Sequence, residues 1–339
     1  MNRLRVLDGW RGISIALVLA GHLFPLGPKP WQMNYAVAGM GMAIFFQLSG
    51  FLITSVLLRD DSTRRFLIHR FMRIVPLAWL ATLITLSAEG SGWHTWLAHL
   101  FFYANWAPMP LTVATQHFWS LCVEVQFYVF VAFLVAIGGR RALWLLPLVA
   151  VIVTALRVHD GRLMTIDTQY RADEILAGCL LALAFHARPE AFSRRWLAWL
   201  PFVAAPLLLL SAHPASGAFN YARPYVATVM IGSTLGLADG QRLRQLLESR
   251  VLRYLALVSY ALYIIHGCLM GSWLGEGGTL EKYLKRPVLL LVTFGLAHLS
   301  TKYYEKYFID LGHKWAGPRP ARPEPANGGS GRMQGPAQD

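Results

Sequence analysis

Ten apolar stretches of about helical length follow one another along the chain, and they limit what it can fold into. With 55% hydrophobic and only 14% charged residues among 339, and a mean hydropathy of +0.42, the chain is too apolar for a soluble domain of this size. A helix needs roughly 20 apolar residues to cross the hydrocarbon core. We therefore expect an all-α polytopic membrane protein with about ten transmembrane helices. The stretches are residues 11–26, 36–58, 70–88, 117–137, 142–157, 172–187, 196–212, 224–238, 253–274 and 286–306.

The positively charged residues indicate how these helices cross the membrane. If the N-terminus is cytoplasmic, 23 of the 31 Lys and Arg residues fall in cytoplasmic segments and eight fall outside. This is the asymmetry that the positive-inside rule requires, so we expect both termini to be cytoplasmic. The net charge of +13 comes largely from these short flanking loops, which indicates the lipid bilayer and no nucleic acid as a partner.

One domain and one tail are expected. Residues 1–314 should form the membrane-embedded domain, and residues 315–339, rich in Pro, Gly and Ala, should be a disordered cytoplasmic tail. The first apolar stretch is followed by PLGPKPW rather than a cleavage pattern, so we expect it to stay as an anchor. Cys122, Cys179 and Cys268 fall inside expected spans, where packing is their expected role, and they form neither a disulfide framework nor a metal-ligand spacing.

Three ionisable side chains within the expected spans mark a candidate site: His22, Glu124 and His266. A charge at mid-membrane costs at least ~2.5–3.5 kcal/mol unless it faces the bundle interior or a wet cavity. The direction of each span and the helical rise place all three in the outer half of the membrane. A histidine can also serve only as an interhelical hydrogen-bond partner; this alternative stays open for His22 and is favoured for His266.

Helical spacing groups further polar residues on shared faces. Arg11 and His22 are eleven residues apart, which is about three turns, so they lie on one face of the first span. A second stripe of one helix face contains His117, Ser120, Glu124 and Tyr128.

The run RRFLIHRFMRIVP at residues 64–76 brings Arg65, Arg70 and Arg73 to the start of the third span. Guanidinium groups match phosphate oxygens in pairs, so the cluster suits a phosphate-rich ligand. Membrane anchoring and the binding of anionic lipid head groups explain the same residues. The cluster alone does not choose between these interpretations.

Six motifs, taken in order, resemble the acyltransferase 3 family of bacterial integral-membrane acyltransferases, which move acyl groups from acyl-CoA to sugars and other hydroxyl acceptors. In RADEILAG, Ile175 stands where the family commonly has leucine. The motifs read LRVLDGWRGISIALVLAGH, FFQLSGFLIT, RRFLIHRFMRIVP, FWSLCVEVQFYV, RADEILAG and VSYALYIIHG.

The resemblance implies a membrane-bound O-acyltransferase of the bacterial inner membrane, which transfers an acyl group, expected to be acetyl, from cytoplasmic acyl-CoA to a hydroxyl of a glycan or glycoside. It also implies that Arg11 and His22 form a required pair and that His22 acts in the transfer. Imidazole titrates near neutral pH and can take the hydroxyl proton. Glu124 could orient His22 and stabilise the imidazolium. Direct transfer and an acyl-histidine intermediate both stay open.

These interpretations assign the remaining site residues. The acyl-CoA contacts are expected from Arg11, Arg65, Arg70 and Arg73, and no metal is expected. Arg171 and Asp173 are expected to form an ion pair rather than to bind the acceptor. The residues expected to line the cavity or bind the acceptor are Gln47, Trp119, Ser120, Tyr128, Arg171, Asp173 and His266.

Two other functions use the same features. A transporter or flippase could use the buried His and Glu residues as a proton relay, although we find no internal repeat. A membrane scaffold without catalysis leaves those buried residues unexplained. The sequence leaves open the acyl group, the acceptor and the oligomeric state.

Overall fold

The computed structural model describes residues 4–108, 110–193 and 195–317, without the side chains of residues 195 and 196. Over these residues the chain is 81% helix and has no strand, which confirms the all-α expectation. The longer helices are α1 (Arg5–Leu23), α2 (Met33–Arg59), α3 (Thr63–Glu89), α5 (Phe118–Gly138), α12 (Arg250–Met270) and α13 (Thr279–Leu299). The shorter ones are α4 (Trp93–Leu100), α6 (Leu146–His159), α7 (Thr168–Arg171), α8 (Asp173–Ala187), α9 (Leu200–Ala212), α10 (Arg223–Gly232), α11 (Arg242–Leu247) and α14 (Lys306–Ala316).

Each of the ten apolar stretches overlaps one of these helices, but the helices differ in length. Among the described residues, five segments are long and apolar enough to cross a membrane. The helices at the other stretches are either short, from 10 residues in α10 to 15 in α8, or carry charges in their first turns, as α13 does. The chain is thus a helical membrane protein, while ten crossings and the side of each terminus stay predictions. The five segments are Arg5–Leu23, Lys29–Arg59, Thr63–Glu89, Phe118–His159 and Arg250–Met270.

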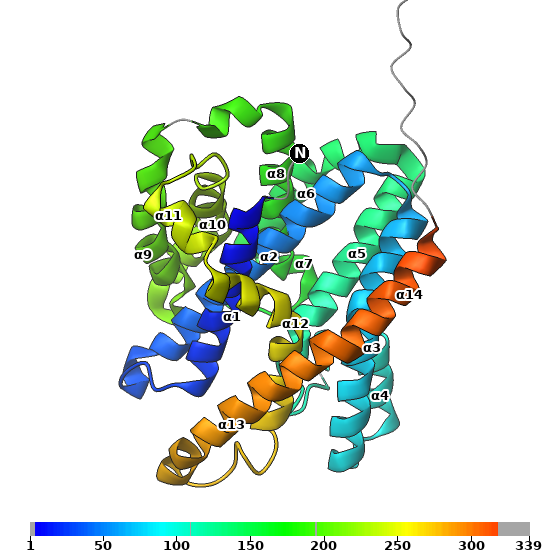
Figure 1. Cartoon of the computed structure of the whole chain (residues 1–339), viewed down its shortest axis with the longest axis vertical. Helices are drawn as coiled ribbons and strands as arrows, with labels where there is room; N and C mark the ends of the chain where they lie inside the picture. The colour runs from blue at the N-terminus through cyan, green and yellow to red at the C-terminus, as the bar shows by residue number, and fades with distance from the viewer. Residues whose placement is uncertain (1–3, 109, 194, 318–339) are drawn as a thin grey trace, which may run out of the picture.

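The end of the described chain is helical. A π-helical segment, Ser300–Glu305, joins α13 to α14, and the two helices form one long line along one side of the molecule (Figure 1). Because α14 runs through Ala316, the first two residues of the expected tail belong to a helix. The rest of that expectation, residues 318–339, lies outside the described residues.

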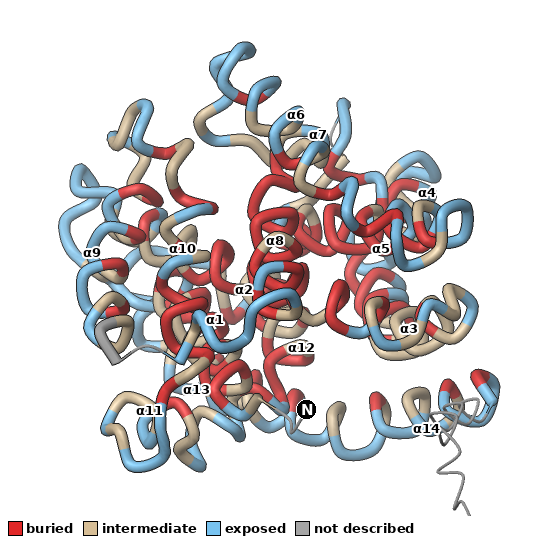
Figure 2. Tube along the Cα trace, turned by 90° about the horizontal axis from the view of Figure 1, so that it is seen from above, coloured by how far each residue is buried: buried red, intermediate tan, exposed pale blue. Residues whose placement is uncertain are grey.

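Helix α2 lies at the centre and packs against α1 and α8 (Figures 1 and 2). Two glycines allow the backbones of α2 and α8 to approach closely. A Cβ atom on Gly50 would lie 1.9 Å from the carbonyl oxygen of Ile175, and one on Gly178 would lie 2.1 Å from that of Gln47. Small residues at a helix interface permit such contact within a membrane. The motifs FFQLSGFLIT and RADEILAG therefore build one interface.

Helices α3, α5 and α12 pack around the central helices and complete the scaffold of the site. Helix α12 packs on α1, and α5 lies between α2 and α3. The buried parts of the chain gather on α2, α5, α8 and α12, whereas α9, α11 and α14 lie at the periphery (Figure 2). Cys122 and Cys179 are buried and Cys268 is half-buried, and all three are free thiols.

Candidate functional site

Three cavities lie in series between the helices, and neighbouring cavities share lining residues. In order, we call the three cavities the basic pocket, the central cavity and the histidine pocket. Arg11 and Arg73 line both the basic pocket and the central cavity. Met42 and Tyr263 line both the central cavity and the histidine pocket. Together they form a path from the N-terminal end of α1 to its C-terminal end.

The basic pocket, of about 1170 Å³, is bordered by the start of α1, by α11 and by the start of α12. Its charged lining has six arginines and three carboxylates, so positive charge prevails. Arg244 is paired with Asp239 at 2.8 Å and with Glu248 at 3.0 Å. The other lining arginines are Arg5, Arg11, Arg73, Arg250 and Arg253. A pocket of this composition favours an anionic ligand.

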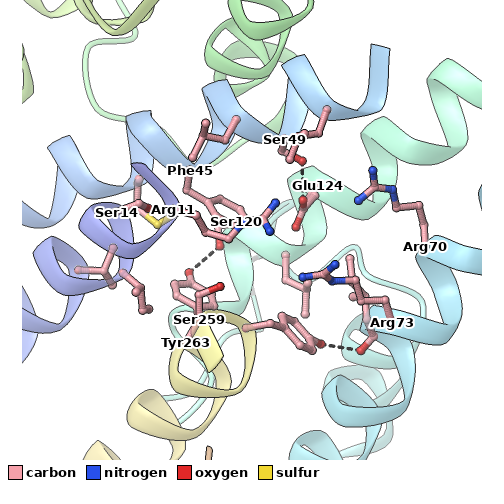
Figure 3. Close-up of a pocket in the computed structure, with 18 of the residues that line it drawn as sticks. Arg11, Ser14, Phe45, Ser49, Arg70, Arg73, Ser120, Glu124, Ser259 and Tyr263 are labelled. Carbon is pink, nitrogen blue, oxygen red and sulfur yellow. Dashed lines mark hydrogen bonds between the residues drawn. The ribbon is translucent and has the colours of Figure 1, made fainter. Parts of the chain in front are cut away.

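The central cavity is narrow, with a volume of about 60 Å³. Figure 3 shows Arg11 of α1 and Arg70 and Arg73 of α3 pointing toward the space beside Glu124 of α5. Arg70 also stacks over Tyr128, with 5.5 Å from its guanidinium carbon to the ring centre. Three guanidinium groups thus face one carboxylate. The excess positive charge inside the bundle makes this space suitable for an anionic group.

Glu124 takes its hydrogen bonds from hydroxyl groups rather than from a histidine. Ser49 Oγ and Tyr128 OH each donate to Glu124 Oε1 at 2.5 Å (Figure 3 shows the bond from Ser49). The carboxylate therefore lies with the arginines of the central cavity and is not the partner of His22 that we expected. Three members of the predicted stripe, Ser120, Glu124 and Tyr128, line this cavity, whereas the fourth, His117, lines the histidine pocket.

The histidine pocket, of about 1030 Å³, contains both predicted intramembrane histidines. His22 Nδ1 lies 2.9 Å from His266 Nε2, and the two rings are within 16° of parallel. His22 is exposed to the pocket, whereas His266 is 0% exposed. His117, from the stripe on α5, lies beside them with its ring centre 5.3 Å from that of His266. Among the described residues no group of three His, Cys, Asp or Glu side chains is placed to hold a metal ion.

Asn34 fixes the end of α1 that carries His22. Its side-chain amide donates to the carbonyl oxygens of Gly21, at 2.6 Å, and of Phe24, at 2.7 Å. Gly21 belongs to the last turn of α1 and Phe24 is its C-cap residue, and carbonyls at this end lack helical partners. Asn34 of α2 thus holds the backbone on both sides of His22.

The expected ion pair between Arg171 and Asp173 is not the one that forms. Arg171 bonds Glu174 at 3.0 Å, and Arg223 bonds the same oxygen of Glu174 at 2.5 Å. Asp173 pairs with the buried Arg157. The difference arises because residues three apart on a helix face each other, while Arg157 and Arg223 come from other helices. Arg171 still lines the histidine pocket and stacks on Trp119, as expected for a cavity residue.

A loop outside the membrane-spanning segments forms the rim of the histidine pocket. Arg162 stacks over Tyr170 at 5.6 Å, and Tyr170 OH donates to Asp160 at 2.6 Å. Hydrogen bonds from Tyr170 and then from His159 lower the pKa of the Asp160 carboxyl, so it stays ionised at neutral pH. The rim is therefore polar and charged.

Three assigned residues lie away from the cavities described above: Asp173, which pairs with Arg157, and also Gln47 and Arg65. Gln47 is 0% exposed and donates to Thr228 of α10 at 2.8 Å, so it serves packing among α2, α8 and α10 rather than lining the cavity. Arg65 forms an ion pair with Asp60 at 2.6 Å in the first turn of α3. We had assigned Arg65 to acyl-CoA, but this geometry makes it a local partner of the α2–α3 turn.

Sequence reasoning missed Tyr263 and Arg223, which line the cavities, and Arg157, which pairs with Asp173. Tyr263 lines two cavities, exchanges a hydrogen bond with Ser120 at 2.5 Å and donates to the carbonyl of His117 at 2.6 Å. Its position three residues before His266, on the same helix face, was a usable signal. Arg157 and Arg223 had no such signal, because a basic residue near a span end is also what membrane anchoring predicts.

The fold and the site define a class: a helical membrane protein with arginines at one end of an internal path and paired imidazoles at the other. The chain belongs to the acyltransferase family described as "Acyltransferase domain" (Acyl_transf_3), whose model matches residues 4–299. This confirms the resemblance carried by the six motifs. Membership in a transferase family favours an enzyme over a transporter or a scaffold.

Curated relatives support this assignment. The putative peptidoglycan O-acetyltransferase YrhL of Bacillus subtilis is 26% identical over 359 aligned residues, covering 88% of this chain and 54% of the relative. The peptidoglycan O-acetyltransferase OatA of Listeria monocytogenes is 26% identical over 230 residues, covering 53% and 33%. A putative O-acetyltransferase of Staphylococcus aureus is 30% identical over 155 residues, covering 37% and 23%. The chain spans about half or less of the length of these relatives, and no solved structure gives a significant match.

Proposed function

We propose that this protein transfers an acetyl group from acyl-CoA to a hydroxyl of a glycan across a bacterial inner membrane. The single observation that carries the proposal is the series of cavities that share Arg11 and Arg73 at one junction and Met42 and Tyr263 at the other. The relatives named as peptidoglycan O-acetyltransferases make peptidoglycan the first acceptor to test.

The donor enters from the arginine end. Acyl-CoA carries several phosphates on its nucleotide, and guanidinium groups bind phosphate through paired hydrogen bonds. The basic pocket is wide enough for a nucleotide, whereas the central cavity, about 60 Å³, suits only the extended arm that ends in the thioester. Arg11 and Arg73 lie where the two meet, so they hold the donor while its acyl end points toward the histidines.

The acceptor enters from the histidine pocket. A hydroxyl is a weak nucleophile at neutral pH and needs a base, and the exposed imidazole of His22 faces this pocket. His22 is eleven residues from Arg11 on the same face of α1, so about 16 Å of helix separate the phosphate-binding end from the base. The thioester arm bridges this distance.

The direct reaction balances without any further reactant. His22 takes the hydroxyl proton as the acceptor oxygen attacks the thioester carbonyl, so a C–O bond forms and the C–S bond breaks. The imidazolium then returns the proton to the departing sulfur. The products are the O-acetyl ester and free CoA.

The test is transfer by the purified protein in liposomes. The protein is incubated with acetyl-labelled CoA and with peptidoglycan fragments, and we expect label on the glycan that alkali releases, as it does from an ester. Label that appears only as free acetate, or that stays on CoA with every glycan offered, would contradict the proposal.

A further inference from the structure

A second hydrogen bond of His266, to the backbone of its own helix, determines which nitrogen donates in the hydrogen bond between His22 and His266. His266 Nδ1 lies 3.0 Å from the carbonyl oxygen of Leu262, one turn earlier in α12. A carbonyl oxygen can only accept, so His266 Nδ1 must carry the hydrogen. In a neutral imidazole the other nitrogen is then an acceptor. His266 Nε2 therefore accepts, and His22 Nδ1 donates across their 2.9 Å separation.

The other proton arrangements are less favourable. A hydrogen on His266 Nε2 alone would set the lone pair of Nδ1 against the lone pairs of the Leu262 oxygen inside the protein, which is repulsive and leaves buried Nδ1 without a donor. A doubly protonated His266 would bury a positive charge at a 0% exposed position. His117, the next ring after His22, is itself an imidazole that donates from Nε2 to the carbonyl of Ile264 at 3.1 Å, so it supplies no negative charge to balance such a cation.

From this bond pattern we propose that His266 is a positioning residue that fixes the tautomer of His22. With the hydrogen held on Nδ1, the lone pair of His22 lies on Nε2. His22 is exposed to the histidine pocket, and its Nε2 makes no hydrogen bond to the described residues. The basic nitrogen of His22 is thus Nε2, and it faces the space where the acceptor binds.

This inference rests on the proposed function, because it specifies which nitrogen of His22 acts as the base in the transfer. The hydroxyl proton passes to Nε2 of His22, and the new imidazolium keeps its Nδ1 hydrogen on the acceptor nitrogen of His266. A carboxylate beside a catalytic histidine has the same two tasks, orientation and stabilisation of the imidazolium. Here a neutral imidazole, anchored by a backbone carbonyl, takes the place that we had expected Glu124 to fill.

The direct test is the protonation pattern of His22, read by ¹⁵N NMR on the full-length protein with labelled histidine. His22→Gln identifies the signals of His22 by their loss. We expect a neutral ring with its hydrogen on Nδ1 in the wild type, and a shift toward Nε2 or a mixture in His266→Leu. His186→Gln should leave the pattern unchanged, because the one hydrogen bond of this α8 histidine to the described residues goes to Ala182 of its own helix. A wild-type His22 with its hydrogen on Nε2 would overturn the inference.

The turnover of His266 variants provides a second test of the positioning role. His266→Leu should lower kcat by about 10–100-fold, by analogy with metal-bound imidazoles that lose the group orienting them, with an unchanged KM for acyl-CoA. His266→Gln should recover part of the loss, because its amide can donate to Leu262 and accept from His22. Equal turnover of His266→Leu and the wild type would overturn the inference.

The NMR result does not depend on transfer. Nδ1 protonation without transfer to any glycan would contradict the proposed function and leave the pairing intact. Transfer with Nε2 protonation would contradict the pairing alone.

Discussion

The two ends of the internal path use opposite chemistry. At the arginine end, Arg11, Arg70 and Arg73 gather fixed positive charge around one carboxylate. At the histidine end, His22, His117 and His266 lie together with neighbours that are imidazoles, a backbone carbonyl and a tyrosine. The first end is suited to bind a charged molecule that it does not change. The second end is suited to move a proton.

This contrast gives a physical reason for the proposed division of roles between Arg11 and His22 on α1. A guanidinium stays protonated and cannot act as a base at neutral pH, whereas a neutral imidazole attracts a phosphate poorly. Losses at the two ends should therefore differ in kind: binding of the donor at one end and the transfer step at the other.

The largest effect is expected at the histidine end. His22→Gln keeps hydrogen-bonding capacity but cannot take a proton, so turnover should fall by about 10²–10⁴-fold while acyl-CoA binding persists. Single-turnover transfer and equilibrium binding of acyl-CoA measure the two quantities. If His22→Gln kept more than about a tenth of wild-type turnover, the imidazole would be structural and the contrast would fail.

Changes at the arginine end should weaken binding instead. Arg73→Ala removes a charged hydrogen-bond donor worth about 1.5–3 kcal/mol, so Kd for acyl-CoA should rise by about 10–150-fold, with Lys restoring only part of it. The matched control is Arg65→Ala, in the same helix but paired with Asp60. If the Arg65 variant weakened binding as much as the Arg73 variant, the sequence-based assignment of Arg65 to the donor would be right after all.

A change at Glu124 tests whether this carboxylate belongs to the arginine end or takes part in the transfer step. Glu124→Gln leaves three arginines without their carboxylate, so the free energy of unfolding in detergent should fall by about 1–3 kcal/mol. Turnover, corrected for folded protein, should fall far less than in His22→Gln, because the carboxylate bonds Ser49 and Tyr128 and not the base. An equal loss of turnover would return Glu124 to the transfer step.

The smallest effect is expected at Gln47. Its amide bonds Thr228 within the helix packing, and such an interhelical bond contributes only about 0.6 kcal/mol on average. Gln47→Met should therefore leave the KM values of both substrates unchanged and shift the unfolding free energy by about that amount. A raised KM for the acceptor would place Gln47 back in the cavity.

Much of the fold and part of the site could be predicted from the sequence, for identifiable reasons. Helical periodicity within one segment placed Arg11 and His22 on one face and Ser120, Glu124 and Tyr128 on another. Contacts between distant segments could not be read in this way: the partner of His22 is 244 residues away, and its identity depends on how α1 and α12 pack. Gln47 was misplaced because α2 is buried on several sides, so a polar residue in it has no single direction to face.

In the proposed mechanism, donor and acceptor approach from opposite ends of one path. Liposomes with one orientation of the protein, established by cysteine labelling, allow acetyl-CoA and a membrane-impermeant glycan acceptor to be placed on chosen sides. We predict acetylation only when acetyl-CoA is on the side of Arg5 and Arg253 and the glycan is on the side of Trp93. Acetylation that requires both substrates on one side would contradict approach from opposite ends.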